Sequence, residues 1–171
     1  LTAWLQARPD DPWAALELAR LKSNDGLDAE AAQLLEPLLA KAASDGQTGH
    51  DIRDTYLNAM LQAQQHLKAY TTCPDRAYAF RHLASRLEWD EMNRMPLREL
   101  IAARLADAPE DPVLWASSAA LHKEEGNLEA ALADVREGAR RGGANQQLMD
   151  VHAEILAHLK RTDEAAAIYR D

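Results

Sequence analysis

Histidines are the first candidates for chemistry, because an imidazole can act as an acid, a base or a metal ligand near neutral pH. The chain has six of them, at His50, His66, His82, His122, His152 and His158. No two histidines have the His-Glu-x-x-His spacing that places two imidazoles on one helix face around zinc, and the single cysteine, Cys73, has no partner thiol. The sequence therefore predicts no metal site.

Carboxylates and glycines do not form a catalytic pattern either. The pairs Asp10-Asp11 and Glu124-Glu125 are sequence neighbours at the expected start and end of helices, where capping and solvation account for them. No Gly-x-Gly-x-x-Gly, phosphate-loop or Gly-x-Ser-x-Gly motif occurs, and we interpret Gly138, Gly142 and Gly143 as helix-ending residues. We expect no enzyme activity and no cofactor.

Composition favours helices and limits the classes of partner. The 171 residues include 34 Ala and 25 Leu but only 4 Ile and 3 Val, which is helix-forming rather than strand-forming usage. With a net charge of −9, the chain lacks the basic surface that nucleic acids require, and no apolar run approaches the roughly 20 residues that span a bilayer. A lone cysteine suits a reducing compartment, so we expect a cytoplasmic protein, with the periplasm as the alternative.

The elements that would position any site repeat along the chain. The segment RPDDPW at 8–13 returns as APEDPV at 108–113, and Gly26 and Ala31 return as Gly126 and Ala131. Three units of about 34 residues account for this offset of 100, if two residues are deleted. The Asp-Pro pairs at 11–12 and 111–112 predict a helix N-cap followed by a first turn.

This pattern resembles the tetratricopeptide repeat (TPR), in which large, small and aromatic residues recur on two helices. The match is best in residues 112–143, through Trp115, Ala119, Gly126 and Ala131. There, Ser118 stands where the family has Leu, His122 where it has Tyr, and Gly143 where it has Pro. Close helix packing is expected at one small residue in each unit except 43–75, namely at Ala19, Ala84, Ala119 and Ala153.

The resemblance implies an all-α fold, a right-handed α-solenoid of stacked antiparallel helix hairpins. We expect one TPR-like domain over residues 1–171, a fragment of a longer protein. Its approximate repeats are 12–43, 44–75, 76–110, 111–144 and a partial repeat, 145–171. Leu1 to Arg8 would be the second helix of an earlier repeat. Residues 43–75 fit least well: the segment 51–70 lacks a central glycine and is either one long helix or two helices with a turn near Ala63.

In the family that the chain resembles, the first helices of successive hairpins line a concave groove that holds a peptide. The resemblance therefore implies an interaction scaffold that binds a peptide or protein segment, without catalysis of its own. The candidate groove residues are Trp13, Glu17, Arg20, Tyr78, Arg81, His82, Ser85, Trp89 and Lys123. The alternative is the substrate-recruiting repeat region of a larger enzyme, such as a glycosyl- or sulfo-transferase. Self-association through the terminal helices is a further expectation.

Overall fold

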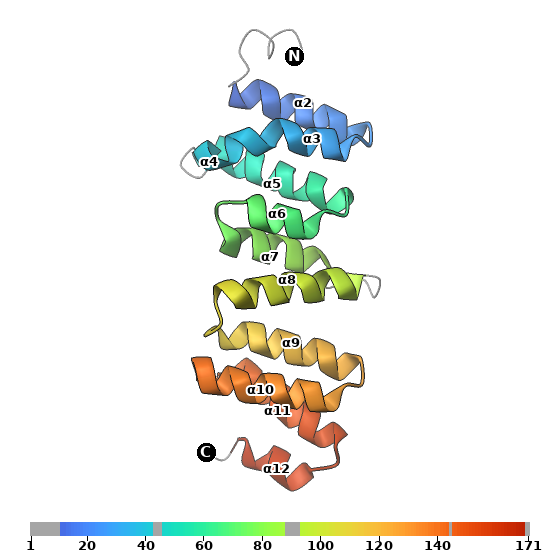
Figure 1. Ribbon diagram of the computed structural model, residues 1–171, viewed down its shortest axis with the longest axis vertical. Helices are drawn as coiled ribbons and strands as arrows, with labels where there is room; N and C mark the ends of the chain where they lie inside the picture. Colours follow the sequence, from blue (N-terminus) through green and yellow to red (C-terminus); the bar gives the residue numbers. More distant parts are fainter. Residues whose placement is uncertain (1–10, 43–45, 88–92, 144, 170–171) are drawn as a thin grey trace. The chain divides into compact units, whose positions relative to one another are not determined.

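The computed structural model describes residues 11–42, 46–87, 93–143 and 145–169 of the chain. Every regular element among these residues is a helix, so the expected all-α fold is confirmed (Figure 1). The chain divides into two compact units, Leu1–Pro96 and Leu97–Asp171. The segment 1–8 and Trp89 lie outside the described residues.

The first unit is a series of short helices that pack on their neighbours along the chain. It contains α2 (Pro12–Asn24), α3 (Asp28–Leu35), the 3-10 turn η1 (Glu36–Leu38), α4 (Leu39–Ala42), α5 (Gly46–Gln62), α6 (His66–Thr72) and α7 (Arg76–Leu87). The central helix α5 packs on α2, α3, α4, α6 and α7. In this unit α2 pairs with α3 and α5 pairs with α6, and α7 packs on both α5 and α6.

The second unit continues the same pattern. It contains most of α8 (Arg94–Asp107), then α9 (Pro112–Glu124), α10 (Leu128–Gly142), α11 (Gln146–His158) and α12 (Thr162–Ala167). Helix α9 pairs with α10, and α11 packs on both of them and on α12. The core between them is made of small and branched apolar side chains, among them Ala119, Ala131, Leu132, Val135, Leu148 and Ile155.

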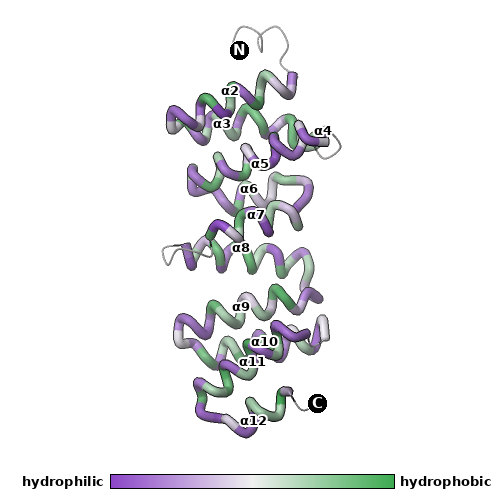
Figure 2. Tube along the Cα trace, turned by 180° about the vertical axis from the view of Figure 1, so that it is seen from behind, coloured by the Kyte–Doolittle hydropathy of each residue, from purple (hydrophilic) through white to green (hydrophobic). Residues whose placement is uncertain are grey.

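The small residues that mark the repeat are buried, as expected. Ala19 and Ala119 have no exposed surface, and Ala84 and Ala153 retain only 6% and 8%. Hydrophilic and hydrophobic residues alternate along the helices (Figure 2). Among the described residues, no helix has the length and apolar character needed to cross a bilayer.

The two Asp-Pro pairs begin equivalent helices. The side chain of Asp11 accepts hydrogen bonds from the amides of Trp13 and Ala14, each at 3.1 Å, and Asp111 accepts one from Val113 at 3.0 Å. The following proline occupies the first helical turn, where its missing amide leaves no hydrogen bond unmade. The predicted helix starts are confirmed.

The glycine turns that join paired helices share one geometry. Gly26 and Gly126 each have a φ of 76°, in the left-handed region that favours glycine. The amide after each glycine donates to the carbonyl five residues earlier, Leu27 to Lys22 and Asn127 to His122, both at 2.8 Å. This is the hydrogen bond of a Schellman helix end.

Two further turns use the same geometry without glycine. Gln64 and Lys160 have φ values of 56° and 59°, and the residues after them, Gln65 and Arg161, again donate to the carbonyl five residues earlier at 2.8 Å. The segment 51–70 is therefore two helices, α5 and α6, joined by a turn at 63–65. Of the two alternatives left open by the sequence, the turn near Ala63 is the one observed.

One interpretation from the sequence was wrong. Gly138 does not end a helix but lies buried inside α10, against Trp115 of α9. A Cβ at Gly138 would lie 2.6 Å from the Cβ of Trp115, which is closer than two carbon atoms can approach. The helix ends four residues later, at Gly142, and Gly143 caps it with a φ of 78°.

Candidate functional site

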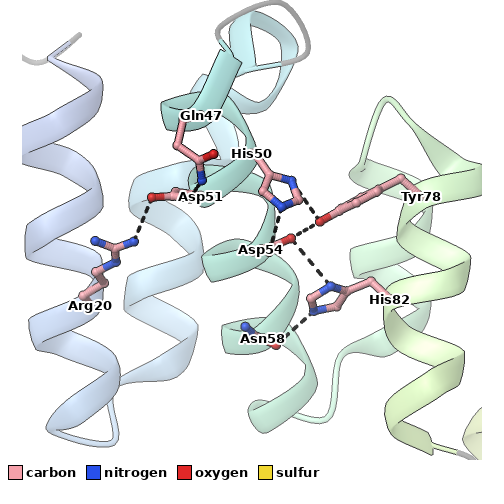
Figure 3. A network of polar contacts seen from close by, with 8 residues as sticks. All are labelled: Arg20, Gln47, His50, Asp51, Asp54, Asn58, Tyr78 and His82. Atoms are coloured by element: carbon pink, nitrogen blue, oxygen red, sulfur yellow. Dashed lines mark hydrogen bonds and ion pairs between the residues drawn. The ribbon is translucent and has the colours of Figure 1, made fainter.

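A row of polar contacts joins side chains of α2, α5 and α7 (Figure 3). We call the surface formed by these side chains the α2-α5-α7 face. At its α2 end, the Arg20 guanidinium donates to Glu17 Oε1 at 2.8 Å and to Asp51 Oδ2 of α5 at 3.2 Å. The side-chain amide of Gln47 donates to the other oxygen of Asp51 at 2.7 Å. Asp51 is thus held by both its own helix and α2.

Asp54 is the centre of the contacts between α5 and α7. The Tyr78 hydroxyl donates a hydrogen bond to Asp54 Oδ1. Two imidazoles flank the same carboxylate: His50 Nε2 lies 3.5 Å from Oδ2, and His82 Nδ1 lies 3.6 Å from Oδ1. These groups meet because residues 50 and 54, and residues 78 and 82, are each one helical turn apart on facing helices.

The second nitrogen of His82 is also held. Its Nε2 lies 3.0 Å from the side-chain oxygen of Asn58, and since a carbonyl oxygen only accepts, Nε2 is the donor. Burial lowers the pKa of His82 because it disfavours the charged imidazole, and the nearby Asp54 carboxylate partly opposes this shift. The side chain of His82 is 11% exposed, whereas those of His50 and Asp54 are 45% and 34% exposed.

Tyr78 is fixed from several sides. The His50 ring meets it edge to face, with ring centroids 5.7 Å apart, and the Arg53 guanidinium carbon lies 5.2 Å from its centroid. Burial raises the pKa of the Tyr78 hydroxyl, and its hydrogen bond to the Asp54 carboxylate raises that pKa further. Tyr78 therefore contributes a positioned ring to the face and keeps its proton.

The residues proposed from the sequence have different surroundings. Trp13 is 62% exposed, and Arg81 and Ser85 are exposed on α7. Arg81 forms no ion pair with any residue that the structure describes. Lys123 belongs to the second unit, where it pairs with Glu154 of α11.

Five polar residues of the face were not found from the sequence. They are Gln47, His50, Asp51, Asp54 and Asn58, all of α5. Without a central glycine in 51–70, the register of that helix could not be set against the repeat pattern. A signal was present in the sequence: positions 47 and 51, and positions 50, 54 and 58, recur every four residues and so share a helix face.

The geometry provides hydrogen-bonding groups on a surface. A pocket of about 750 Å³ in the first unit is lined by Ser85 and Arg86 but not by Asp54, Tyr78 or the flanking imidazoles. Within the described part of the chain, no three His, Cys, Asp or Glu side chains are placed to hold a metal ion. Donors and acceptors therefore line the face from α2 to α7.

Comparison with known proteins found similarity in fold alone. No protein-family model and no curated protein sequence matches the chain. A tetratricopeptide repeat protein from Parabacteroides merdae is similar in structure, with a TM-score of 0.42 and 15% identity over 99% of this chain and 67% of the other. So are the nearly identical TPR-like repeats of a protein described as a kinesin light chain from Podosopora anserina, with a TM-score of 0.45 and 17% identity over 93% of each chain. Because its paired helices are joined by turns with the same hydrogen-bonding geometry, this chain has a TPR-like repeat fold.

Proposed function

We propose that this chain is a protein-interaction module that binds a peptide segment of a partner protein along the α2-α5-α7 face. The observation that carries the proposal is the row of partly exposed polar groups that runs across three helices from Arg20 to His82. An extended peptide has unpaired backbone amides and carbonyls along its length, and such a row offers it both donors and acceptors.

Two exposed side chains on this face are suited to anchor a partner. Trp13 begins α2 and Arg81 lies on α7 beside the polar row, and tryptophan and arginine are the residue types that most often dominate binding energy. Arg20 and Glu17 are less available, because Arg20 already pairs with both Glu17 and Asp51. The polar row would orient the segment, and the anchors would supply most of the affinity.

The proposed function does not include catalysis. Asp54 with two imidazoles has the residue types of acid-base chemistry, but proton transfer to a substrate requires that the substrate be held in position beside those groups. Half of the His50 side chain and a third of the Asp54 side chain are in contact with solvent. No observation favours the alternative that the chain recruits substrates for a larger enzyme.

A peptide selection tests the proposal. Peptides are selected from a displayed random library on the wild-type chain, and their dissociation constants are measured for the Trp13→Ala and Arg81→Ala variants. Each substitution removes an exposed anchor, so we expect the affinity to fall by about 5- to 30-fold. Both side chains are exposed, so the helical content measured by circular dichroism should not change.

The matched control is Arg136→Ala, which removes an exposed arginine from α10 of the second unit. It should leave the affinity of the selected peptides unchanged. If these peptides bind the Trp13→Ala and Arg81→Ala variants as tightly as the wild type, the α2-α5-α7 face is not the binding site.

A further inference from the structure

The two departures from the repeat pattern on α9 form one polar cluster. Ser118 and His122 stand where the resembled family has Leu and Tyr, and both contact Asp134 of α10. Ser118 Oγ donates to Asp134 Oδ2 at 2.6 Å, and His122 Nδ1 lies 2.9 Å from the same oxygen. The smaller side chains are thus held toward α10, which leaves space on the α8 side of α9.

That space is a pocket of about 260 Å³ within the second unit. It is lined by Arg98, Ile101, Ala102 and Leu105 of α8 and by Ser118, Leu121 and His122 of α9. Its volume is below the roughly 300 to 1,000 Å³ of pockets for drug-sized ligands, so it suits a group of about one aromatic ring. Most of the lining is aliphatic, which favours an apolar body for that group.

The polar groups of the pocket indicate which substituent a bound aromatic ring should have. A carboxylate only accepts, so His122 donates to Asp134 from Nδ1, and its Nε2 has no partner among the described residues. When the imidazole is neutral, Nε2 accepts a hydrogen bond, and when it is protonated, Nε2 donates one. A hydroxyl can meet either state, because it both donates and accepts.

The remaining polar lining residue argues against an acidic ligand. The guanidinium of Arg98 already pairs with the carboxylate of Glu125. The pocket therefore has no uncompensated positive charge among its described lining residues to offset burial of a carboxylate. An aromatic ring with a neutral hydroxyl suits both the aliphatic lining of the pocket and Nε2 of His122.

We propose that this pocket binds a phenol ring, with the phenol hydroxyl hydrogen-bonded to Nε2 of His122. Asp134 acts as a positioning residue, since its bond to Nδ1 fixes the imidazole ring and its tautomer. The inference does not depend on the function proposed above, because the pocket lies in the second unit and the α2-α5-α7 face in the first.

Two small probes test the proposal on the whole chain. p-Cresol and toluene, which differ by the hydroxyl, are titrated while NMR follows the His122 ring and the methyl groups of Ile101 and Leu121. We expect saturable shifts at these residues and binding of p-cresol about five-fold tighter than toluene, the effect of one hydrogen bond. Shifts that do not saturate, or equal affinity for both probes, would overturn the proposal.

Variants locate the site while Asp134 and its hydrogen bond from Ser118 are left in place. Ala102 is exposed on α8 and lines the pocket, so Ala102→Leu should fill the space and remove binding of both probes. His122→Phe should keep the apolar body of the pocket but abolish the preference for p-cresol. The matched control Ala133→Leu, at an exposed position of α10, should bind like the wild type. If Ala102→Leu binds p-cresol normally, the phenol lies elsewhere and the proposal fails.

A third probe distinguishes the two possible sources of the phenol ring, which are a tyrosine side chain of a partner protein and a free small molecule. The capped peptide acetyl-Gly-Tyr-Gly-amide presents a tyrosine side chain with flanking backbone. Binding of this peptide tighter than p-cresol would support a partner's tyrosine as the occupant, and exclusion of the peptide with retained p-cresol binding would support a small phenol. Failure of both the peptide and p-cresol to bind would overturn the assignment.

Discussion

Gly138 shows how one residue can be determined by a contact that local sequence does not reveal. Glycine inside a helix normally destabilises it relative to alanine, by roughly 0.5 to 1 kcal/mol. At this position the order should be reversed, because an added methyl group would overlap the Cβ of Trp115 and approach Leu148. We predict that Gly138→Ala lowers the free energy of unfolding by about 1 to 3 kcal/mol in urea denaturation.

The adjacent residue provides the control for helix propensity. Ala139 is exposed on the same helix, so Ala139→Gly should cost only about 0.5 to 1 kcal/mol, the ordinary price of glycine. A Gly138→Ala variant more stable than the wild type would show that α9 and α10 approach each other less closely than described.

His82 should make the stability of the first unit depend on pH. Burial lowers its pKa in the folded state below the ordinary value of 6.5, so the unfolded chain binds the proton more tightly. The stabilising contribution of neutral His82 is therefore fully present above pH 6.5 and is lost as the pH falls through the folded-state pKa. Asp54 opposes the shift, while Arg86 and His50 reinforce it.

The measurement is the free energy of unfolding of the wild type and of His82→Gln between pH 7.5 and 5. We predict that the variant shows a shallower decline in stability toward low pH than the wild type. Ser85→Ala, an exposed and non-titrating change on the same helix, should keep the wild-type profile. Parallel profiles for His82→Gln and the wild type would contradict the predicted burial of a neutral imidazole.

At the scale of elements, the turns between paired helices predict how glycine at positions 64 and 160 would change the stability of the chain. A non-glycine residue in the left-handed region costs roughly 1 to 2 kcal/mol, and Gln64 and Lys160 both have this conformation. Gln64→Gly and Lys160→Gly should each raise the free energy of unfolding by about 1 kcal/mol. Gly126→Ala, which places a side chain in the same conformation, should lower it by a similar amount.

A neighbouring position separates this effect from general flexibility. Ala63 precedes Gln64 in the turn but does not have a positive φ, so Ala63→Gly should not stabilise the chain. If Ala63→Gly and Gln64→Gly change the unfolding midpoint equally, the backbone conformation at Gln64 is not the cause.

These turns also explain how far the sequence could predict the elements and the site. The hairpin α9-α10 was predictable because Gly126 marks its turn and Asp111-Pro112 marks its start. The turn of α5-α6 could be given only as one of two alternatives, because Gln64 adopts the conformation that glycine adopts elsewhere. For the same reason, the residues that α5 contributes to the α2-α5-α7 face, including Asp54, were not predicted.

Side-chain contacts between different helices could not be predicted from the sequence, for a different reason. Lys123 was a reasonable candidate for contact with a ligand, but its charge is matched by Glu154, 31 positions along the chain. Likewise, Ser118 and His122 were visible as departures from the repeat, whereas their common partner Asp134 depends on how α10 packs against α9. Composition and spacing predict which helices form, and packing decides which side chains meet.

At the scale of the whole molecule, the question is whether the chain unfolds as one domain or two. The expectation of a single domain over 1–171 remains a prediction, while the structure contains two compact units with cores of their own. In stacked repeats, each module contacts only its neighbours, so local unfolding can occur without loss of the whole. Leu57 in the first unit and Leu132 in the second are buried, with 0% and 2% exposure, and report on the two cores separately.

Hydrogen exchange measured by mass spectrometry in low urea distinguishes these cases. Leu57→Ala and Leu132→Ala should each cost about 2 to 5 kcal/mol, because each leaves a cavity in a packed core. If the units unfold separately, Leu57→Ala lowers protection in 46–87 and spares 112–158, while Leu132→Ala does the reverse. Each variant is thus the control for the other. Equal loss of protection along the whole chain in both variants would instead show one cooperative domain, because damage to either core would then have to destabilise the same unfolding unit.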